Sequence, residues 1–337
     1  MRVREGPARC GMGFQPMHHR HELAPAQAGD ADATCRTSSI AGGPDIAALD
    51  RRGFLQMAVA ATGVGTLALA RSGQAATPNG LIDVNAYLGR WPLRHLPGED
   101  TAELVSRLRR HGVVQGWVGN VDSLLHRDMA TVNARLADEC RRYGDGLLVP
   151  FGSVNAKLPD WQDDLRRCVE EHHMPGIRLH PNYHGYKLDD PDFTKLLRLA
   201  AERGMIVQLV LIMEDERIMH PLLRVEPTSV TGLAGLLKQT PGLRLVLLNS
   251  QRVLRVQTLA ELMAAGEVYV DIAMLEGVGG VAGLLAKVPP DRVLFGSYTP
   301  LFYFESALLK LLESPLNDEQ LGAIRGANAW RLLAKNR

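Results

Sequence analysis

The residues best suited to chemistry stand at the ends of short apolar runs. Arg178 and His180 are two apart in the run Gly176–His180, so a strand would place both side chains on one face. Imidazole exchanges a proton near neutral pH, which makes His180 a candidate general acid or base. Arg178 is a permanent cation whose guanidinium fork suits a carboxylate or phosphate. The structural alternatives are a hydrogen-bonded core histidine and an inward arginine paired with Asp83, Asp271 or Glu214.

Two carboxylates complete the catalytic candidates. Glu214 directly follows one apolar run, and Asp271 stands at the end of another. Carboxylates about 5–9 Å apart can perform glycosidase-like acid–base chemistry. The alternative for the run Glu214–Arg217 is a solvated surface loop.

Four neutral polar residues occupy comparable positions: Asn85, Tyr87, Asn249 and Tyr298. Gathered in one place, their amide and phenol groups would form a polar pocket that binds hydroxyl-rich or carboxylate ligands. We therefore take these four as candidate ligand-binding residues beside the catalytic candidates His180, Arg178, Glu214 and Asp271.

Eight apolar runs that alternate with helical stretches must position these residues. The predicted strands are Leu81–Ala86, Val113–Gly119, Leu147–Ser153, Gly176–His180, Ile206–Ile212, Arg244–Asn249, Val268–Ile272 and Val293–Ser297. A last helix is predicted over Asp318–Lys335, with Asn317 or Asp318 as its N-cap. This rhythm predicts an α/β fold, a (β/α)8 TIM barrel over residues 77–337. A doubly wound open sheet is the alternative, although no GxGxxG follows the first strand.

Composition narrows the functional classes. Of the 337 residues, 46% are hydrophobic and 22% charged, which is typical of a globular protein. Lys+Arg number 38 and Asp+Glu number 37, so no basic excess predicts a nucleic-acid partner. The four cysteines form no CxxC pair, which excludes a zinc ribbon. The expected partner is a small-molecule substrate or ligand, and the oligomeric state, a homodimer included, stays open.

The N-terminal part of the sequence differs from the rest. Residues 1–49 have no apolar periodicity and are predicted to be disordered or a mis-assigned upstream extension. Arg51-Arg52-Gly53-Phe54-Leu55 resembles the twin-arginine export motif, and an uncharged run follows it as far as Ala70. We therefore predict a twin-arginine signal peptide over residues 50–76, with the export machinery as a partner and a periplasmic location. An uncleaved signal would anchor the protein to the membrane; a buried amphipathic helix is the structural alternative.

Several motifs, taken in order, resemble the amidohydrolase-related family. They are Ile82-Asp83-Val84-Asn85-Ala86-Tyr87, Gly176-Ile177-Arg178-Leu179-His180-Pro181, Leu294-Phe295-Gly296-Ser297 and Asn328-Ala329-Trp330-Arg331-Leu332-Leu333. The resemblance runs from about residue 81 to 334 and points to the decarboxylase and lactonase branch of the amidohydrolase superfamily. It implies a (β/α)8 barrel that hydrolyses or decarboxylates small carboxylate, lactone or amide substrates with a divalent metal.

The sequence departs from this family where the family places its metal ligands. Those positions correspond here to Asn85, Tyr87, Val210, Asn249 and Tyr298. Zinc requires three or four nitrogen, sulfur or carboxylate donors, so no metal is expected at the usual site. A relocated zinc site at His180, His184, Glu214 and His220 is the alternative. Because Pro181–Gly185 is predicted to be a loop, His180 and His184 are not expected to have helical i,i+4 geometry.

Three functions follow from these observations. The first is an exported hydrolase-like enzyme that works without the usual metal. The second is a barrel that binds a small ligand and has lost catalysis. The third is a metal hydrolase with relocated ligands. Since fold does not determine function, the sequence leaves all three open.

Overall fold

Residues 80–335 are described by the structure, a computed structural model. The predicted segment 1–49 and the predicted signal 50–76 lie outside these residues. Eight strands follow one another in chain order, each parallel to the next. They are β1 Leu81–Leu88, β2 Val113–Asn120, β3 Leu148–Gly152, β4 Gly176–Leu179, β5 Ile206–Val210, β6 Arg244–Leu248, β7 Glu267–Asp271 and β8 Val293–Leu294.

The sheet closes on itself between β8 and β1. The Val84 amide donates to the Phe295 carbonyl at 3.0 Å, and the Tyr87 amide donates to the Thr299 carbonyl at 2.9 Å. A parallel bridge also links Ala86 with Thr299. The predicted (β/α)8 barrel is therefore confirmed, and the open doubly wound sheet is excluded.

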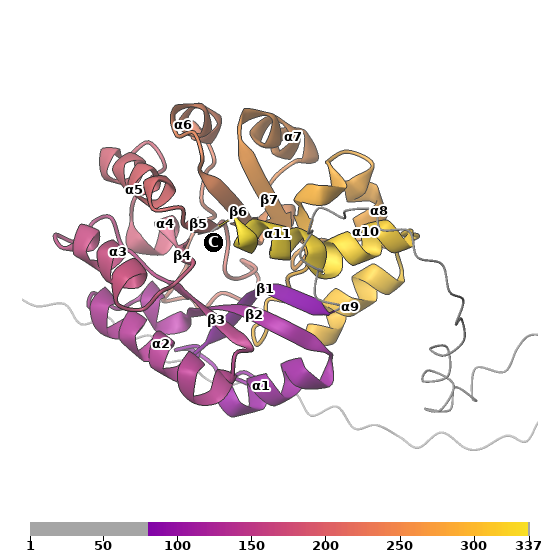
Figure 1. The fold of residues 1–337 in the computed structure, drawn as a ribbon, viewed down its shortest axis with the longest axis horizontal. Coiled ribbons are helices and arrows are strands. Elements are labelled where there is room, and N and C mark those ends of the chain that lie inside the picture. The colour runs from indigo at the N-terminus through magenta and orange to yellow at the C-terminus, as the bar shows by residue number, and fades with distance from the viewer. Residues whose placement is uncertain (1–79, 336–337) are drawn as a thin grey trace, which may run out of the picture. The chain divides into compact units, whose positions relative to one another are not determined.

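Helices surround the ring of strands, as Figure 1 shows. They are α1 Thr101–Arg110, α2 Met129–Gly144, α3 Trp161–Glu170, α4 Pro181–His184, α5 Pro191–Glu202, α6 Leu233–Gln239, α7 Val256–Ala265, α8 Gly280–Leu285, α9 Phe304–Leu312, α10 Asp318–Gly322 and α11 Asn328–Ala334. Short 3-10 helices cover Val121–Leu124, Ser250–Arg252 and Pro290–Arg292.

The strands separate two apolar layers. Alternate residues such as Val207, Leu209 and Leu245 pack outward against the helices. Residues between them, such as Val210 and Val246, fill the barrel interior together with Leu332 of α11. This period of two is what a strand with both faces buried requires. In β1 this alternation is interrupted, because the pairing of β1 with β2 shifts register between Asp83 and Ala86.

One local prediction was wrong. Residues Pro181–His184 form a helical turn rather than a loop, since the His184 amide donates to the His180 carbonyl at 3.0 Å. The predicted helix Asp318–Lys335 is confirmed as far as Ala334, with a π-helical segment, Ala323–Ala327, in its middle. There the Ile324 carbonyl accepts a bond from the Phe295 amide next to β8. The predicted N-cap is confirmed, because Asn317 and Gln320 form a reciprocal capping box.

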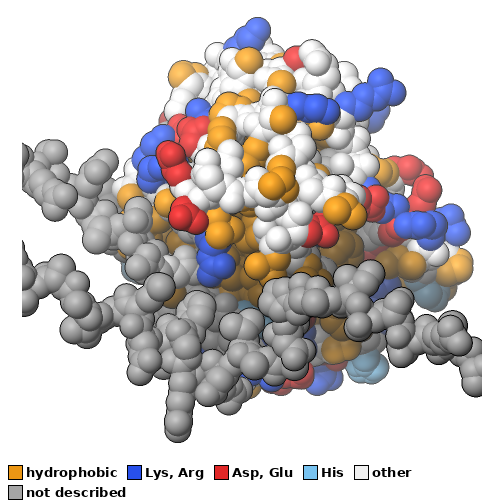
Figure 2. Space-filling model, turned by 90° about the vertical axis from the view of Figure 1, so that its right-hand side faces the viewer, with side chains coloured by type: hydrophobic (Ala, Val, Ile, Leu, Met, Phe, Trp, Pro, Cys, Tyr) orange, Lys and Arg blue, Asp and Glu red, His pale blue; other side chains and the backbone are white. Residues whose placement is uncertain are grey.

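The described surface is of mixed character. Between residues 80 and 335, every helix is too short or too polar to cross a bilayer. Figure 2 shows the side that carries α8 to α10, where apolar and charged side chains intermingle rather than forming a field of one charge.

Candidate functional site

The four predicted ligand-binding residues do meet, at the end of the barrel where the strands terminate. Asn85 and Tyr87 come from β1, Asn249 follows β6, and Tyr298 follows β8. The Asn85 amide nitrogen donates to Oδ1 of Asn249 at 2.9 Å. The rings of Tyr87 and Tyr298 meet edge to face, with their centroids 5.8 Å apart. All four side chains are buried, so they contact one another rather than an open pocket.

Asp271 holds the two asparagines in place. Its Oδ2 accepts a bond from the Asn85 amide nitrogen at 2.7 Å, and its Oδ1 accepts one from the Asn249 backbone amide at 2.9 Å. Burial raises the pKa of Asp271, while these two bonds act in the opposite direction. The carboxylate predicted to be catalytic thus orients neighbouring amides and is fully buried behind them.

Tyr298 is fixed by its backbone and by its phenol. Its amide donates to the Asn85 carbonyl at 2.7 Å, and its hydroxyl donates to the Met213 carbonyl at 2.5 Å. Burial raises its pKa well above the usual range, so the phenol stays neutral. Tyr298 and Asn249 both adopt left-handed backbone, with φ of 63° and 58°. Such conformations are uncommon outside glycine and gather at functional sites.

His180 lies beside the other phenol. Its Nε2 is 3.0 Å from the hydroxyl of Tyr87, and its Nδ1 has no hydrogen-bond partner among the described residues. Burial lowers the pKa of His180 well below the usual value, helped by His184 and Arg178. The His184 ring lies 6.1 Å away, and its Nε2 donates to the Ser123 carbonyl at 2.8 Å. A neutral imidazole is therefore enclosed at the predicted acid–base position.

Arg178 is not available to a ligand. Its Nε donates to Gln208 at 2.7 Å, and Nη1 donates to the Ala86 carbonyl at 2.6 Å. Nη2 donates to the carbonyls of Val84 and Trp117, and the guanidinium lies over the Tyr87 ring. Its exposure is 0%. The predicted carboxylate anchor therefore holds the main chains of β1 and β2, and the alternative pairing with Asp83, Asp271 or Glu214 is also wrong.

Glu214 lies at the rim of the barrel and has a different partner. Its carboxylate forms an ion pair of 2.9 Å with Arg94, in the loop after β1. The side chain is 2% exposed, so the solvated-loop alternative fails for this residue. No sequence pattern pointed to Arg94, because it stands in a loop without periodicity. Glu214 and Asp271 have separate partners and form no shared acid–base pair.

Asp83 joins β1 to the end of β8. Its Oδ1 accepts bonds from the Asn85 and Ser297 amides, both at 3.0 Å, and Oδ2 accepts one from the Ser297 hydroxyl at 2.5 Å. Burial raises the pKa of Asp83 to about 6, against the effect of these bonds. Asp83 therefore has a structural role: it links β1 to Ser297, which follows β8.

Apolar side chains cover this polar network. Trp91, Met213 and Met274 are buried and pack in one cluster with Tyr87 and Tyr298. The network is consequently shielded from bulk solvent, which strengthens its hydrogen bonds and makes any unpaired group costly.

The residues at the five family metal positions do not fit a divalent metal. Val210 offers no donor, and burial keeps both phenols neutral. The two asparagines offer only neutral amide oxygens: that of Asn249 accepts a bond from Asn85, and that of Asn85 has no partner among the described residues. Metal sites of this kind need nitrogen, sulfur or carboxylate donors. Within residues 80–335, no group of three His, Cys, Asp or Glu could hold a metal elsewhere.

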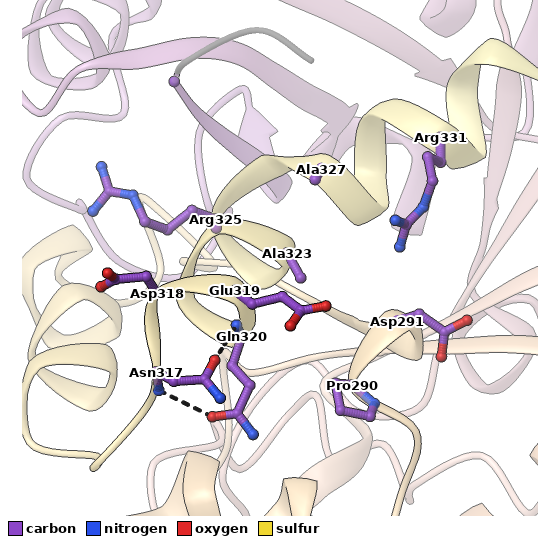
Figure 3. Close-up of a pocket in the computed structure, with 12 residues that line it drawn as sticks. Pro290, Asp291, Asn317, Asp318, Glu319, Gln320, Ala323, Arg325, Ala327 and Arg331 are labelled. Atoms are coloured by element: carbon purple, nitrogen blue, oxygen red, sulfur yellow. Dashed lines mark hydrogen bonds between the residues drawn. The ribbon is translucent and has the colours of Figure 1, made fainter. Parts of the chain in front are cut away.

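The described pockets lie around this sealed network rather than in it. One of about 440 Å³ opens beside the loops after β7 and β8, and a neighbour of about 410 Å³ lies beside the loops after β5 and β6. Figure 3 shows another, of about 660 Å³, between α10, α11 and the residues before β1 and β8. That pocket is at the end where the strands begin, whereas barrel enzymes act at the opposite end.

Comparisons with known proteins agree with the fold. A family model described as Amidohydrolase matches residues 93–335. The fold is similar to 2,6-dihydroxybenzoate decarboxylase from Rhizobium, with 16% identity, a TM-score of 0.58 and coverage of 77% of this chain and 99% of that one. The fold is also similar to 5-carboxyvanillate decarboxylase from Sphingomonas paucimobilis, with 13% identity, a TM-score of 0.60 and coverage of 76% of this chain and 99% of that one.

A third similar structure contains a metal. Dihydroxybenzoic acid decarboxylase from Polaromonas sp. was solved with manganese and the inhibitor 2-nitroresorcinol; it has 16% identity, a TM-score of 0.57 and coverage of 77% and 98%. Curated proteins include no match to this sequence. At these identities, the likeness of the solved structures extends to the fold alone.

Proposed function

The chain belongs to the amidohydrolase family, and we propose that it is a metal-independent member that binds a small carboxylate ligand and has lost hydrolysis and decarboxylation. The observation that carries this proposal is the closed network at the strand ends. Asn85, Asn249 and Asp271 bond to one another, and Tyr298 bonds to the Met213 carbonyl. Among these groups, only the side-chain oxygen of Asn85, a neutral amide oxygen, has no hydrogen-bond partner among the described residues. One such donor does not hold a divalent metal.

Electrostatics support the same conclusion. Decarboxylation and hydrolysis build negative charge that a metal or an aimed hydrogen-bond donor must stabilise. The buried cation Arg178 already donates to four protein oxygens. The hydroxyl of Tyr298 is engaged as well, so the network offers little to a developing oxyanion.

One observation favours a second candidate, metal-independent acid–base catalysis by His180. Its imidazole is neutral, lies 3.0 Å from a phenol and keeps Nδ1 without a partner among the described residues. A neutral imidazole of this kind can accept a proton if a substrate reaches it. His180→Ala distinguishes the two candidates, because it abolishes turnover in an enzyme and leaves ligand binding intact in a binding protein.

The proposal is tested by incubating the full-length protein with manganese and with zinc, removing free metal, and measuring bound metal by mass spectrometry. Carbon dioxide release from 2,6-dihydroxybenzoate is measured on the same samples. We expect far less than one bound metal ion per chain, and carbon dioxide release no greater than in buffer without protein. Stoichiometric metal with metal-dependent carbon dioxide release would overturn the proposal. Release without metal that His180→Ala removes would favour the second candidate.

We also propose export to the periplasm through the twin-arginine pathway, on the strength of Arg51-Arg52 and the uncharged run after them. Residues 50–76 fused to a reporter should direct it out of the cytoplasm. Replacing Arg51 and Arg52 by lysine should retain the reporter inside. A fusion that stays in the cytoplasm with both arginines present would contradict this prediction.

A further inference from the structure

A pocket beside the sealed network combines an apolar wall with a cation. It has a volume of about 440 Å³ and lies against the loops after β7 and β8. Met274, Leu301 and Phe302 supply apolar surface, and Tyr303 and Ser306 line it from the start of α9. This volume falls within the range of small-molecule sites, which are mostly apolar with a few placed polar groups.

Lys310 supplies the charge of this pocket. It extends from α9, and its Nζ donates to the Ile272 carbonyl at 3.2 Å and to the Ala273 carbonyl. An ammonium group has three donors, so one N–H of Lys310 remains without an acceptor among the described residues. Two neutral carbonyls hold this cation at the pocket wall without neutralising it.

The other charged residues of the pocket are already paired. Arg252 forms ion pairs with Asp215 at 2.7 Å and with Glu276 at 2.6 Å. No carboxylate that the structure describes forms an ion pair with Lys310. The side chain is half-buried, and burial lowers the pKa of Lys310 while the charges of Asp271, Glu276 and Glu313 raise it. A partly buried cation whose hydrogen bonds go to neutral carbonyls and not to a carboxylate favours an anionic ligand beside it.

The pocket is adjacent to the predicted site but separated from it. Phe302 stacks edge to face on Tyr298, with ring centroids 5.3 Å apart. Met274 belongs to the apolar cluster that covers the strand ends. These two side chains form the partition, so a ligand can occupy the pocket without disturbing the hydrogen bonds of Asn85 and Asp271.

We propose that this pocket binds a small monocarboxylate with an aromatic or branched apolar body. Its carboxylate accepts the free N–H of Lys310, and its apolar body packs on Met274, Leu301 and Phe302. One unpaired cation matches one carboxylate. The proposal rests on the proposed function, because it locates the ligand of that function between β7 and β8 rather than on the barrel axis.

The test is titration calorimetry of the full-length protein with benzoate and with benzamide, its neutral counterpart. We expect benzoate to bind and benzamide to bind roughly tenfold more weakly or not at all. Lys310→Met should weaken benzoate binding about tenfold or more. Lys238→Met removes an exposed lysine of α6 and should change nothing.

A second variant guards against a folding defect in Lys310→Met. Ser306→Trp keeps the lysine and fills the pocket from its rim, so it should also abolish benzoate binding. Thermal unfolding of each variant verifies that it is folded. Equal binding of benzoate and benzamide would overturn the proposal, and so would unchanged benzoate binding in folded Lys310→Met.

The outcomes separate this proposal from the proposed function. Unchanged benzoate binding in both variants would place the ligand elsewhere and leave the proposed function standing. No benzoate binding up to about 20 mM would overturn both the carboxylate-binding part of the proposed function and its location in this pocket. Metal-dependent carbon dioxide release together with Lys310-dependent binding would overturn the loss of catalysis and support the pocket.

Discussion

The hydroxyl of Tyr87 lies 3.0 Å from Nε2 of His180, and both side chains are sealed from solvent. Burial raises the pKa of Tyr87 to about 12 and lowers that of His180 well below its usual value. The two groups therefore face each other in their neutral forms at physiological pH. Tyr87 occupies a position that the family resemblance assigns to a metal-binding histidine, and here it serves as a hydrogen-bond partner.

Removing this hydroxyl should destabilise the barrel. Tyr87→Phe leaves Nε2 of His180 buried without its partner, which costs about 1–3 kcal/mol. The free energy of unfolding in urea measures this loss. Tyr143→Phe is the matched control, because Tyr143 is 48% exposed. Equal stability of the two variants would mean that the Tyr87–His180 bond contributes nothing.

Asp271→Asn should destabilise the protein, although the two side chains have nearly the same shape. The carboxylate accepts bonds from the Asn85 side chain and from the Asn249 amide, one at each oxygen. An amide in its place would turn an NH₂ group toward one of these donors. We expect a loss of about 2–3 kcal/mol in the free energy of unfolding. Asp291→Asn, at a side chain 62% exposed, should change it by less than about 0.5 kcal/mol. A similar effect of both would contradict the anchoring role of Asp271.

Gly119→Ala tests whether Arg178 is locked. A Cβ at residue 119 would lie 2.8 Å from Cδ and 3.1 Å from Nη1 of Arg178. The guanidinium cannot retreat without breaking its bonds to main-chain carbonyls, so we expect a loss of about 1–3 kcal/mol. Gly235→Ala in α6 meets no atom within 4 Å and should be neutral or slightly stabilising. Urea unfolding of both variants measures the contrast, and a harmless Gly119→Ala would show that Arg178 can move.

Asp83 should make stability depend on pH. Its folded pKa is about 6, above the ordinary 3.8, so the folded state binds the proton more tightly. The stabilisation is complete below pH 3.8 and is lost as the pH rises through about 6, a change of about 3 kcal/mol. Asp83→Asn has no titrating carboxyl group at this position and therefore lacks this pH-dependent contribution to the free energy of unfolding. We expect its free energy of unfolding to fall less than that of the native protein between pH 4 and 7. Parallel profiles would contradict the raised pKa.

The architecture could be predicted from the sequence because both faces of each strand are buried. Runs such as Ile206–Val210 are short, apolar and separated by amphipathic helices, which is the pattern of a parallel barrel. The final helix was less predictable, because its π-helical segment depends on a bond between Ile324 and Phe295, which precedes it by almost thirty residues. Local periodicity contains no information about such a contact.

The site was predictable in position but not in chemistry. Strand ends converge in a barrel, so Asn85, Asn249 and Tyr298 were expected to meet, and they do. Their mutual hydrogen bonds and the closure over them could not be inferred, since these depend on side-chain directions and on loops. Arg178 is the clearest case: its spacing predicts that it faces inward, but only the structure shows the carbonyls that surround it.

The left-handed backbone at Tyr298 has a consequence for how this barrel could be re-engineered or could evolve. Asparagine and aspartate adopt that conformation more readily than tyrosine does. An acidic residue could therefore replace Tyr298 with less backbone strain than the tyrosine now bears. The main chain at this strand end is compatible with side chains that this protein does not carry. The groups that these strand ends offer to a ligand can thus be changed by substituting side chains, without a change in the main chain.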